Sequence, residues 1–181
     1  MENGREELQG TVKKELMVSQ IRSAARQFAM LYFHFCKTLV DCFGAAEAED
    51  LVRKTVFELA VDRTDKMRIA AEQQGVSTIT LEGFNTVTDL PYHGWIAEWG
   101  ADHCPYAETW RPYCKEYPWF QKFALLYCDV IDTTTIENFT KHLSHRITQN
   151  VVASGESCER IYFESEKVKN GGFTYREEGE K

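Results

Sequence analysis

The sequence predicts an α+β fold, in which a long N-terminal helical hairpin is followed by a small antiparallel sheet covered by helices. Two features predict this class. Apolar residues recur at steps of three and four over two long stretches, at about 11–43 and 46–74, which is typical of amphipathic helices. Two extended stretches, 144–152 and 158–164, then flank a turn at 154–156, which is typical of a β-hairpin.

Length and composition fit one domain of this class. The chain has 181 residues, of which 43% are hydrophobic and 27% are charged, close to an average globular protein. We predict a flexible N-terminus at 1–10, a single α+β domain at 11–166 and a flexible tail at 167–181, where Gly, Lys and Glu are frequent.

The first helix is expected to bury one apolar stripe. Its members share helical spacing: Ile21, Ala24, Ala25, Phe28, Tyr32, Phe35 and Leu39. Gly44 can adopt the backbone conformation that ends such a helix. Cys36 and Cys42 lie in this helix and are expected to be small buried packing residues.

The second helix should end at Gly75 and pack antiparallel to the first, because the link between them is short. Its expected stripe again has helical spacing: Ala48, Leu51, Val52, Thr55, Val56, Leu59 and Ala60. Beyond Arg63 the residues become more highly charged. We therefore expect the last turns to project into solvent.

The middle of the chain predicts a strand that runs into a helix. Residues 76–93 are ambiguous, because 77–80 fit either a helix cap or a short strand. Alternating residues predict a strand at 95–102. Cys104-Pro105 then fits a helix start, since proline is favoured at the first helical position.

Prolines should divide the helical region that follows. Pro112 and Pro118 predict two short helices up to about Tyr127 rather than one long helix. Residues 138–142 predict another short helix.

In the hairpin, alternation predicts that Ile161 and Phe163 face the core, while Arg160 and Tyr162 lie on the opposite face. Strict alternation places Cys158 with Arg160, away from the core, unless a bulge redirects it.

Charge and composition exclude several classes of partner. A net charge of -7 argues against nucleic acid, which requires a concentrated basic surface. Apolar runs fall short of the ~20 residues that cross a bilayer, so we expect no membrane partner. The polar N-terminus and unevenly spaced cysteines indicate free thiols in a reducing, cytoplasmic setting. The first helix also offers a surface for a homodimer.

Cys104 is the strongest candidate for chemistry. At a helix N-terminus, unpaired N–H groups and the helix dipole favour a thiolate. We expect Cys104, Asp129 and Cys158 to approach one another around a pocket, with His103 and Glu108 as further groups that move protons.

Three alternatives remain open. A metal site could use some of the histidines and cysteines between residues 103 and 158, but no close cysteine pair such as C-x2-C supports it, and we expect no cofactor or metal. A pocket that binds without turnover could be lined by aromatic side chains, namely Tyr92, Trp95, Trp99, Trp110, Trp119 and Phe120. Finally, all of the cysteines could be packing residues without a chemical role.

The P-loop, G-x-G-x-x-G, G-x-S-x-G and H-E-x-x-H motifs are absent, which argues against nucleotide, serine-esterase and zincin chemistry.

The layout resembles a known family. A helical first half is followed by Cys104-Pro105, by Cys128-Asp129, and by Gly155-x-x-Cys158 before an aromatic strand. This arrangement, over about residues 29–164, resembles the L-2-amino-thiazoline-4-carboxylic acid hydrolase family. A weaker likeness connects the Gly155-x-x-Cys158 hairpin to non-catalytic small-molecule-sensing domains of the vinyl-reductase type.

The resemblance implies a hydrolase that opens a small cyclic amidine or isothiourea. The reaction would be hydrolysis of a non-peptide carbon–nitrogen bond, with an N-carbamoyl-cysteine-like product, on a route to cysteine. Expected substrate-binding residues provide aromatic surface, a thiol and guanidinium groups for a carboxylate: Trp95, Trp99, Trp110, Cys128, Arg146 and Arg160.

Overall fold

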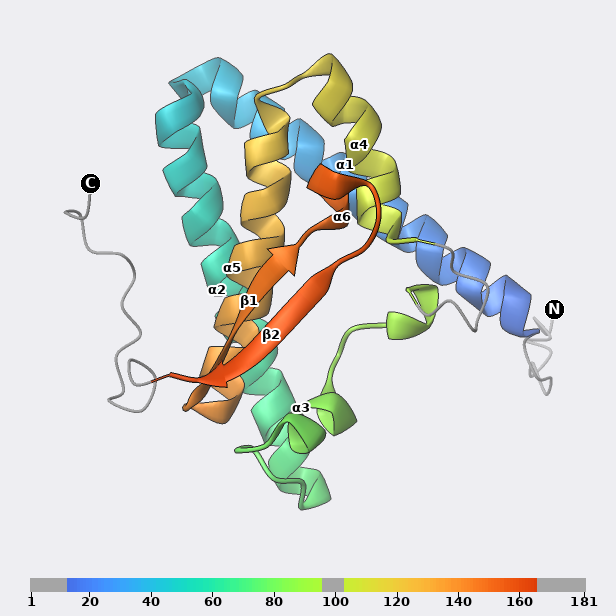
Figure 1. Cartoon of the computed structure of the whole chain (residues 1–181), viewed down its shortest axis with the longest axis vertical. Coiled ribbons are helices and arrows are strands. Elements are labelled where there is room, and N and C mark those ends of the chain that lie inside the picture. The colour runs from blue at the N-terminus through green and yellow to red at the C-terminus, as the bar shows by residue number, and fades with distance from the viewer. Residues whose placement is uncertain (1–12, 96–102, 166–181) are drawn as a thin grey trace, which may run out of the picture.

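The computed structural model describes residues 13–95 and 103–165, with the side chain of Tyr92 excepted. The α+β class is confirmed, because long helices are combined with one two-stranded antiparallel sheet (Figure 1). The predicted flexible ends and nearly all of the predicted strand at 95–102 lie outside the described residues. The elements follow in chain order: α1 (Lys14–Phe43), α2 (Ala45–Gln74), α3 (Leu81–Val87), η1 (Tyr92–Gly94), α4 (Pro105–Glu116), α5 (Phe120–Thr140), β1 (Leu143–Gln149), α6 (Val151–Ser154) and β2 (Glu159–Glu164).

The buried face of α1 differs from the predicted stripe. Its buried residues are Val18, Arg22, Ala25, Ala29, Tyr32, Phe33 and Cys36. Phe35, predicted to be in the core, is 62% exposed, whereas its neighbour Phe33 is 2% exposed. Phe33 stacks on Tyr113 of α4, with ring centroids 3.9 Å apart. The prediction for Cys36 is confirmed, but Cys42 is exposed.

Only Gly44 separates α1 from α2, and its φ of +83° favours glycine. We expected α1 and α2 to pack mainly against each other, but each packs more extensively against another helix. In Figure 1 the two helices diverge from the bend that joins them, and α5 lies beside α2. The most extensive contacts of α2 are with α5, and those of α1 are with α4.

The final turns of α2 do not project into solvent. Thr64, Met67 and Ala71 are buried, and Met67 and Ala71 pack with Phe139 at the end of α5. The expected end at Gly75 is confirmed, since Gly75 has left-handed backbone angles and its N–H bonds to the carbonyls of the last turn. The ambiguous stretch 77–80 is a helix cap, because Oγ1 of Thr80 accepts a hydrogen bond from the N–H of Gly83 in α3.

Pro105 begins α4 and Cys104 is its N-cap, as predicted. The expected division of this region into two helices is confirmed, but the second helix is much longer than expected. Pro112 lies inside α4 on its exposed side, so the helix continues across it. Only Pro118 falls between helices, and α5 then runs for 21 residues to Thr140, which includes most of the separate helix expected at 138–142.

The hairpin presents the face opposite to the predicted one. His145 pairs with Tyr162 and Ile147 pairs with Arg160, so these residues share a face. That face lies against α5, because Arg160 contacts Asp132 there. Ile161 and Phe163 are instead 49% and 45% exposed. A register shift between Ile147 and Gln149 and the short helix α6 replace a simple turn.

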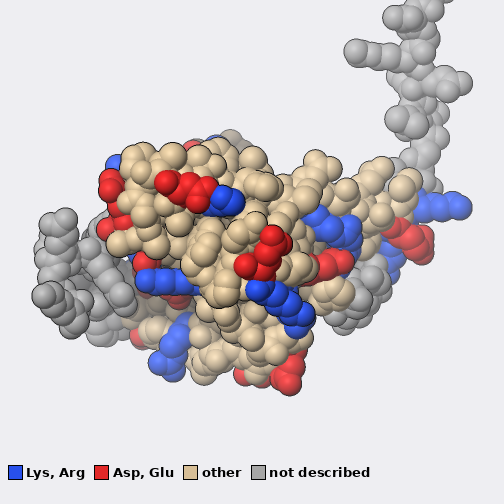
Figure 2. Space-filling view, turned by 90° about the horizontal axis from the view of Figure 1, so that it is seen from above, with Lys and Arg blue, Asp and Glu red and all other residues tan. Residues whose placement is uncertain are grey.

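One aromatic core unites α1, α4 and α5. Tyr32 donates a hydrogen bond to the carbonyl of Phe123, and Trp110 donates one to the carbonyl of Ala29. Outside this core, acidic and basic side chains are interspersed on the face seen in Figure 2. None of the helices in the described parts of the chain is long and apolar enough to cross a membrane.

Candidate functional site

A cavity of about 960 Å³ lies where the hairpin, α5 and the start of α4 meet the segment that follows α3. Its wall includes apolar side chains such as Phe28, Ile131 and Val152, together with thiols and charged groups. A space of this size and mixed character fits a small-molecule ligand.

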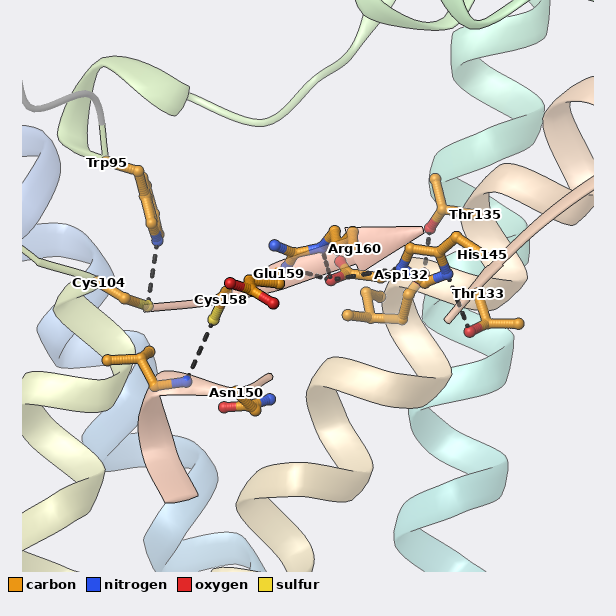
Figure 3. A network of polar contacts seen from close by, with 12 residues as sticks. Trp95, Cys104, Asp132, Thr133, Thr135, His145, Asn150, Cys158, Glu159 and Arg160 are labelled. Carbon is orange, nitrogen blue, oxygen red and sulfur yellow. Dashed lines mark hydrogen bonds and ion pairs between the residues drawn. The ribbon is translucent and has the colours of Figure 1, made fainter. Parts of the chain in front are cut away.

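Three thiols from separate elements line this cavity. Cys104 comes from the N-cap of α4, Cys128 from the middle of α5, and Cys158 from the segment before β2. Figure 3 shows Cys104 and Cys158 toward one end of the drawn residues and His145 toward the other. Cys114 packs against the aromatic core instead and does not line the cavity.

Cys104 is held by hydrogen-bond donors at its sulfur. Nε1 of Trp95 donates to Sγ of Cys104 at 3.3 Å (Figure 3). Burial raises the pKa of the Cys104 thiol, and the N–H groups of Ala107, Trp95 and Tyr106 offset this only in part. Cys104 therefore keeps its proton at neutral pH, contrary to the thiolate expected at a helix N-terminus, because desolvation outweighs those donors.

The other two thiols have different surroundings. Burial, with a smaller contribution from the charge of Asp132, raises the pKa of Cys128. Cys158 is half-buried, and its sulfur accepts a hydrogen bond from the backbone N–H of Val151 at 3.4 Å. Cys158 therefore combines access to the cavity with a donor directed at its sulfur.

The charged end of the cavity is a cluster of three side chains, Asp132, His145 and Arg160 (Figure 3). Arg160 donates to Oδ2 of Asp132 from Nε at 3.1 Å and from Nη2 at 2.6 Å. Burial acts to raise the pKa of the Asp132 carboxyl, but its contacts with His145 and Arg160 outweigh burial, and the net pKa is lowered. Asp132 is therefore a carboxylate at neutral pH.

His145 completes this cluster from β1. It is 4% exposed, and its Nδ1 lies 3.2 Å from the hydroxyl of Thr133. Its Nε2 lies 3.9 Å from Oδ2 of Asp132, too far for a hydrogen bond, and has no hydrogen-bond partner within the described residues. A buried imidazole nitrogen without a partner is uncommon and marks a site that can accept a proton or another group.

Asp129, predicted to be catalytic, is exposed and does not line the cavity. Asp132 lines the cavity instead, because residues four apart lie on the same face of a helix and Asp132 is four residues after Cys128. Sequence reasoning missed Asp132 and considered His145 only as a metal ligand. The four-residue spacing from Cys128 was the available signal for Asp132, and its use required the prediction of one continuous helix over Phe120–Thr140.

His103 and Glu108 occupy the rim rather than the interior. His103 lines the cavity with its side chain 40% exposed, and its Nε2 lies 3.8 Å from Oε2 of Glu108. Glu108 does not line the cavity and pairs with Arg22 and Arg26 of α1. Buried Arg22 also donates to the carbonyls of Gly94 and His103, at 2.9 and 2.6 Å. Glu108 and Arg22 thus fix the chain on either side of Cys104.

The predicted substrate-binding residues separate into two groups. Trp95, Cys128 and Arg160 line the cavity. Trp110 is 0% exposed in the core, and Arg146 points to solvent on the outer face of the hairpin, so neither is positioned to contact a ligand. Trp99 lies outside the described residues. Of the wider aromatic wall, Trp119 and Phe120 belong to the core rather than to the cavity.

The cavity and its surroundings offer no set of metal ligands among the described residues. Within residues 13–95 and 103–165, no group of three or more His, Cys, Asp or Glu side chains is arranged to hold a metal ion.

No family model matches this chain, and neither curated proteins nor solved structures gave a match.

Proposed function

We propose that this protein hydrolyses a small cyclic isothiourea that bears a carboxylate, of the 2-amino-thiazoline-4-carboxylate type, in the cavity between the hairpin and α5. One observation carries the proposal: Cys104, Cys128 and Cys158 line the same cavity as the Asp132–Arg160 ion pair. The cavity thus combines sulfur groups that can attack a ring carbon with a guanidinium group that can hold a carboxylate.

The protonated state of Cys104 favours a basic substrate. Because burial raises the pKa of this thiol, Cys104 needs a group that accepts its proton before it can attack. The ring nitrogen of an amidine is such a base. Transfer of the Cys104 proton to that nitrogen produces a thiolate and an amidinium carbon together, and the sulfur then bonds to this carbon.

The covalent route consumes one water molecule. After Cys104 bonds to the ring carbon, the bond from that carbon to the ring sulfur breaks, and the ring sulfur leaves as a thiolate that takes up a proton. Water then adds to the same carbon, and Cys104 leaves with a proton. The sum is substrate plus one water, and the product is an N-carbamoyl amino acid with a free thiol.

The family resemblance led us to expect cleavage of a carbon–nitrogen bond, but this product requires cleavage of a different bond. An N-carbamoyl product retains the ring carbon–nitrogen bond and requires cleavage of the carbon–sulfur bond. Cleavage of the carbon–nitrogen bond would give the S-carbamoyl isomer instead. The two products have the same mass, so a thiol reagent distinguishes them, because only the N-carbamoyl isomer has a free thiol.

The test is incubation of the purified protein with L-2-amino-thiazoline-4-carboxylate, followed by mass spectrometry and thiol titration. We expect ring opening by the wild type, loss of turnover in Cys104→Ser, and unchanged turnover in Cys114→Ser, whose thiol lies outside the cavity. Full turnover in a folded Cys104→Ser variant would remove Cys104 from the mechanism.

A second function, binding without turnover, is favoured by a specific observation. The raised pKa keeps the Cys104 thiol protonated, and a protonated thiol is a weak nucleophile. Asp132 is already paired with Arg160, so this carboxylate is not free to act as a general base. A sensor of this kind would bind the same ligand saturably and release it unchanged. Prolonged incubation with ligand separates the two functions, since a carbamoyl product excludes the binding-only alternative for that ligand.

A further inference from the structure

We infer that Arg160 forms a carboxylate-binding subsite in the cavity and that His145 takes up a proton when the carboxylate binds. The inference deepens the proposed function and rests on it for the class of ligand, a small cyclic acid.

Arg160 retains donors for a ligand. Its Nε and Nη2 both donate to one oxygen of Asp132, and within the described residues its Nη1 makes no hydrogen bond. Arg160 lines the cavity, and its side chain is 34% exposed. A guanidinium group has five N–H donors, so a second carboxylate can bind beside the first.

The charge balance requires a further positive charge. Asp132 and Arg160 together are neutral, so a bound carboxylate adds one uncompensated negative charge in a half-buried site. The described titratable and charged groups that face His145 are Asp132 from α5 and Arg160 and Tyr162 from β2. Histidine is the side chain among these that gains a proton most readily near neutral pH.

His145 is placed to provide that charge. Its unpartnered Nε2 lies 3.9 Å from the same Oδ2 of Asp132 that Arg160 uses. A proton on Nε2 lets His145 form an ion pair with the Asp132 carboxylate. This second ion pair weakens the one between Asp132 and Arg160. The guanidinium group then becomes available to the ligand, so carboxylate binding and protonation of His145 favour each other.

The test uses thiazolidine-4-carboxylate, which has the ring and the carboxylate but has a methylene in place of the amidine carbon. Its binding to the full chain is measured by titration calorimetry at pH 6 and pH 8, in two buffers that differ in ionisation enthalpy. Thiazolidine without the carboxylate is the matched ligand. We expect selective binding of the acid, uptake of a proton, and an affinity that falls with rising pH by up to about tenfold per pH unit, the limit for one proton.

Variants separate the two roles. We expect Arg160→Gln to lose at least about tenfold in affinity, the size of a charge-assisted contact, and Arg146→Gln, on the outer face, to bind as the wild type does. His145→Gln should lose the proton uptake, whereas His142→Gln, outside the cavity, should keep it. The wild-type measurements remain decisive if His145→Gln does not fold.

Absence of binding, equal binding of both ligands, or binding without proton uptake would overturn the inference. Its failure is distinguishable from that of the proposed function. If the acid binds as expected but the amidine acid is never opened, the subsite stands and the hydrolase proposal fails. If the amidine acid is opened and Arg160→Gln has an unchanged KM, the hydrolase stands and the subsite fails.

Discussion

Oδ2 of Asp132 accepts two hydrogen bonds from Arg160, at 3.1 and 2.6 Å, and this pair joins β2 to α5. The same carboxylate lies beside His145 of β1. One side chain of α5 therefore faces both strands of the hairpin, so that the stability of the hairpin and the charge state of the cavity depend on the same group.

Asp132 should make stability fall in acid. A carboxyl whose pKa is lowered by folding stabilises the fold above its ordinary pKa of 3.8, and this contribution is lost as the pH falls through the folded-state value. Because both partners are about one-third exposed, we expect Asp132→Asn to cost only about 1 kcal/mol at pH 7. Urea unfolding at pH 7 and pH 3 should show this cost become smaller in acid, whereas Asp129→Asn should have little effect at either pH.

Arg22 should contribute far more to stability than Arg26, although both contact Glu108. Arg22 is 6% exposed and also bonds two backbone carbonyls, at Gly94 and His103. We expect Arg22→Met to lower the free energy of unfolding by about 2–3 kcal/mol, because hydrogen bonds to charged groups are strong and their carbonyl partners would be left unpaired. Arg26→Met should cost at most about 0.5 kcal/mol. Equal effects of the two variants in urea unfolding would contradict the assigned role of Arg22.

Two neighbouring phenylalanines of α1 test which face of this helix is buried. Phe33 stacks on Tyr113 in the core, whereas Phe35 is 62% exposed. Phe33→Ala should destabilise the protein by about 3–5 kcal/mol through lost burial and a cavity. Phe35→Ala should change stability by less than about 0.5 kcal/mol, as expected for a surface position. Thermal unfolding of both variants checks the prediction, and a large loss for Phe35→Ala would indicate that another surface covers it.

The cysteines should react with iodoacetamide in a defined order. Cys42 is exposed and should be alkylated first. Burial raises the pKa of Cys36 to about 12, and this residue is 0% exposed, so it should react only after unfolding. Cys104, whose pKa is also raised, should react slowly at pH 7 and faster as the pH rises. Peptide mass mapping at pH 7 and pH 9 measures the order, and rapid labelling of Cys104 at pH 7 would show that it is a thiolate.

Substitution of Trp95 should affect the cavity, whereas substitution of Trp110 should affect the stability of the core. Trp110 donates a hydrogen bond inside the core, and Trp110→Phe should cost about 1–3 kcal/mol in urea unfolding. Trp95 donates to Sγ of Cys104 instead. Trp95→Phe should leave stability nearly unchanged but slow the alkylation of Cys104, because loss of a donor raises the pKa of the thiol further. An unchanged rate would show that the Trp95 contact does not influence this sulfur.

Local patterns predicted the elements well where the signal lay within a few residues. The two long helices, the cap at Cys104-Pro105 and the existence of the hairpin all follow from spacing, proline and glycine. Pro112 misled the prediction, because one proline on the exposed side of a helix removes one hydrogen bond without ending it.

Residues that face one another across the fold could not be predicted in this way. Arg22 is buried because its partners lie more than 70 residues further along the chain, and no local pattern reports them. The hairpin turns Arg160 rather than Ile161 toward the helices because Asp132 provides a charged partner there. Hydrophobic alternation assumes that the apolar face of a strand turns toward the core, and a partly exposed ion pair between hairpin and helix reverses that assumption here.

The hairpin supplies the last wall of the cavity, which has a consequence for the order of biosynthesis. A nascent chain that has emerged only as far as Thr140 contains Cys104, Cys128 and Asp132 but not Cys158 or Arg160. Most of the aromatic core comes from α1, α4 and α5, which all precede the strands in the chain. The cavity is therefore completed late in translation, after the helices that form most of its walls.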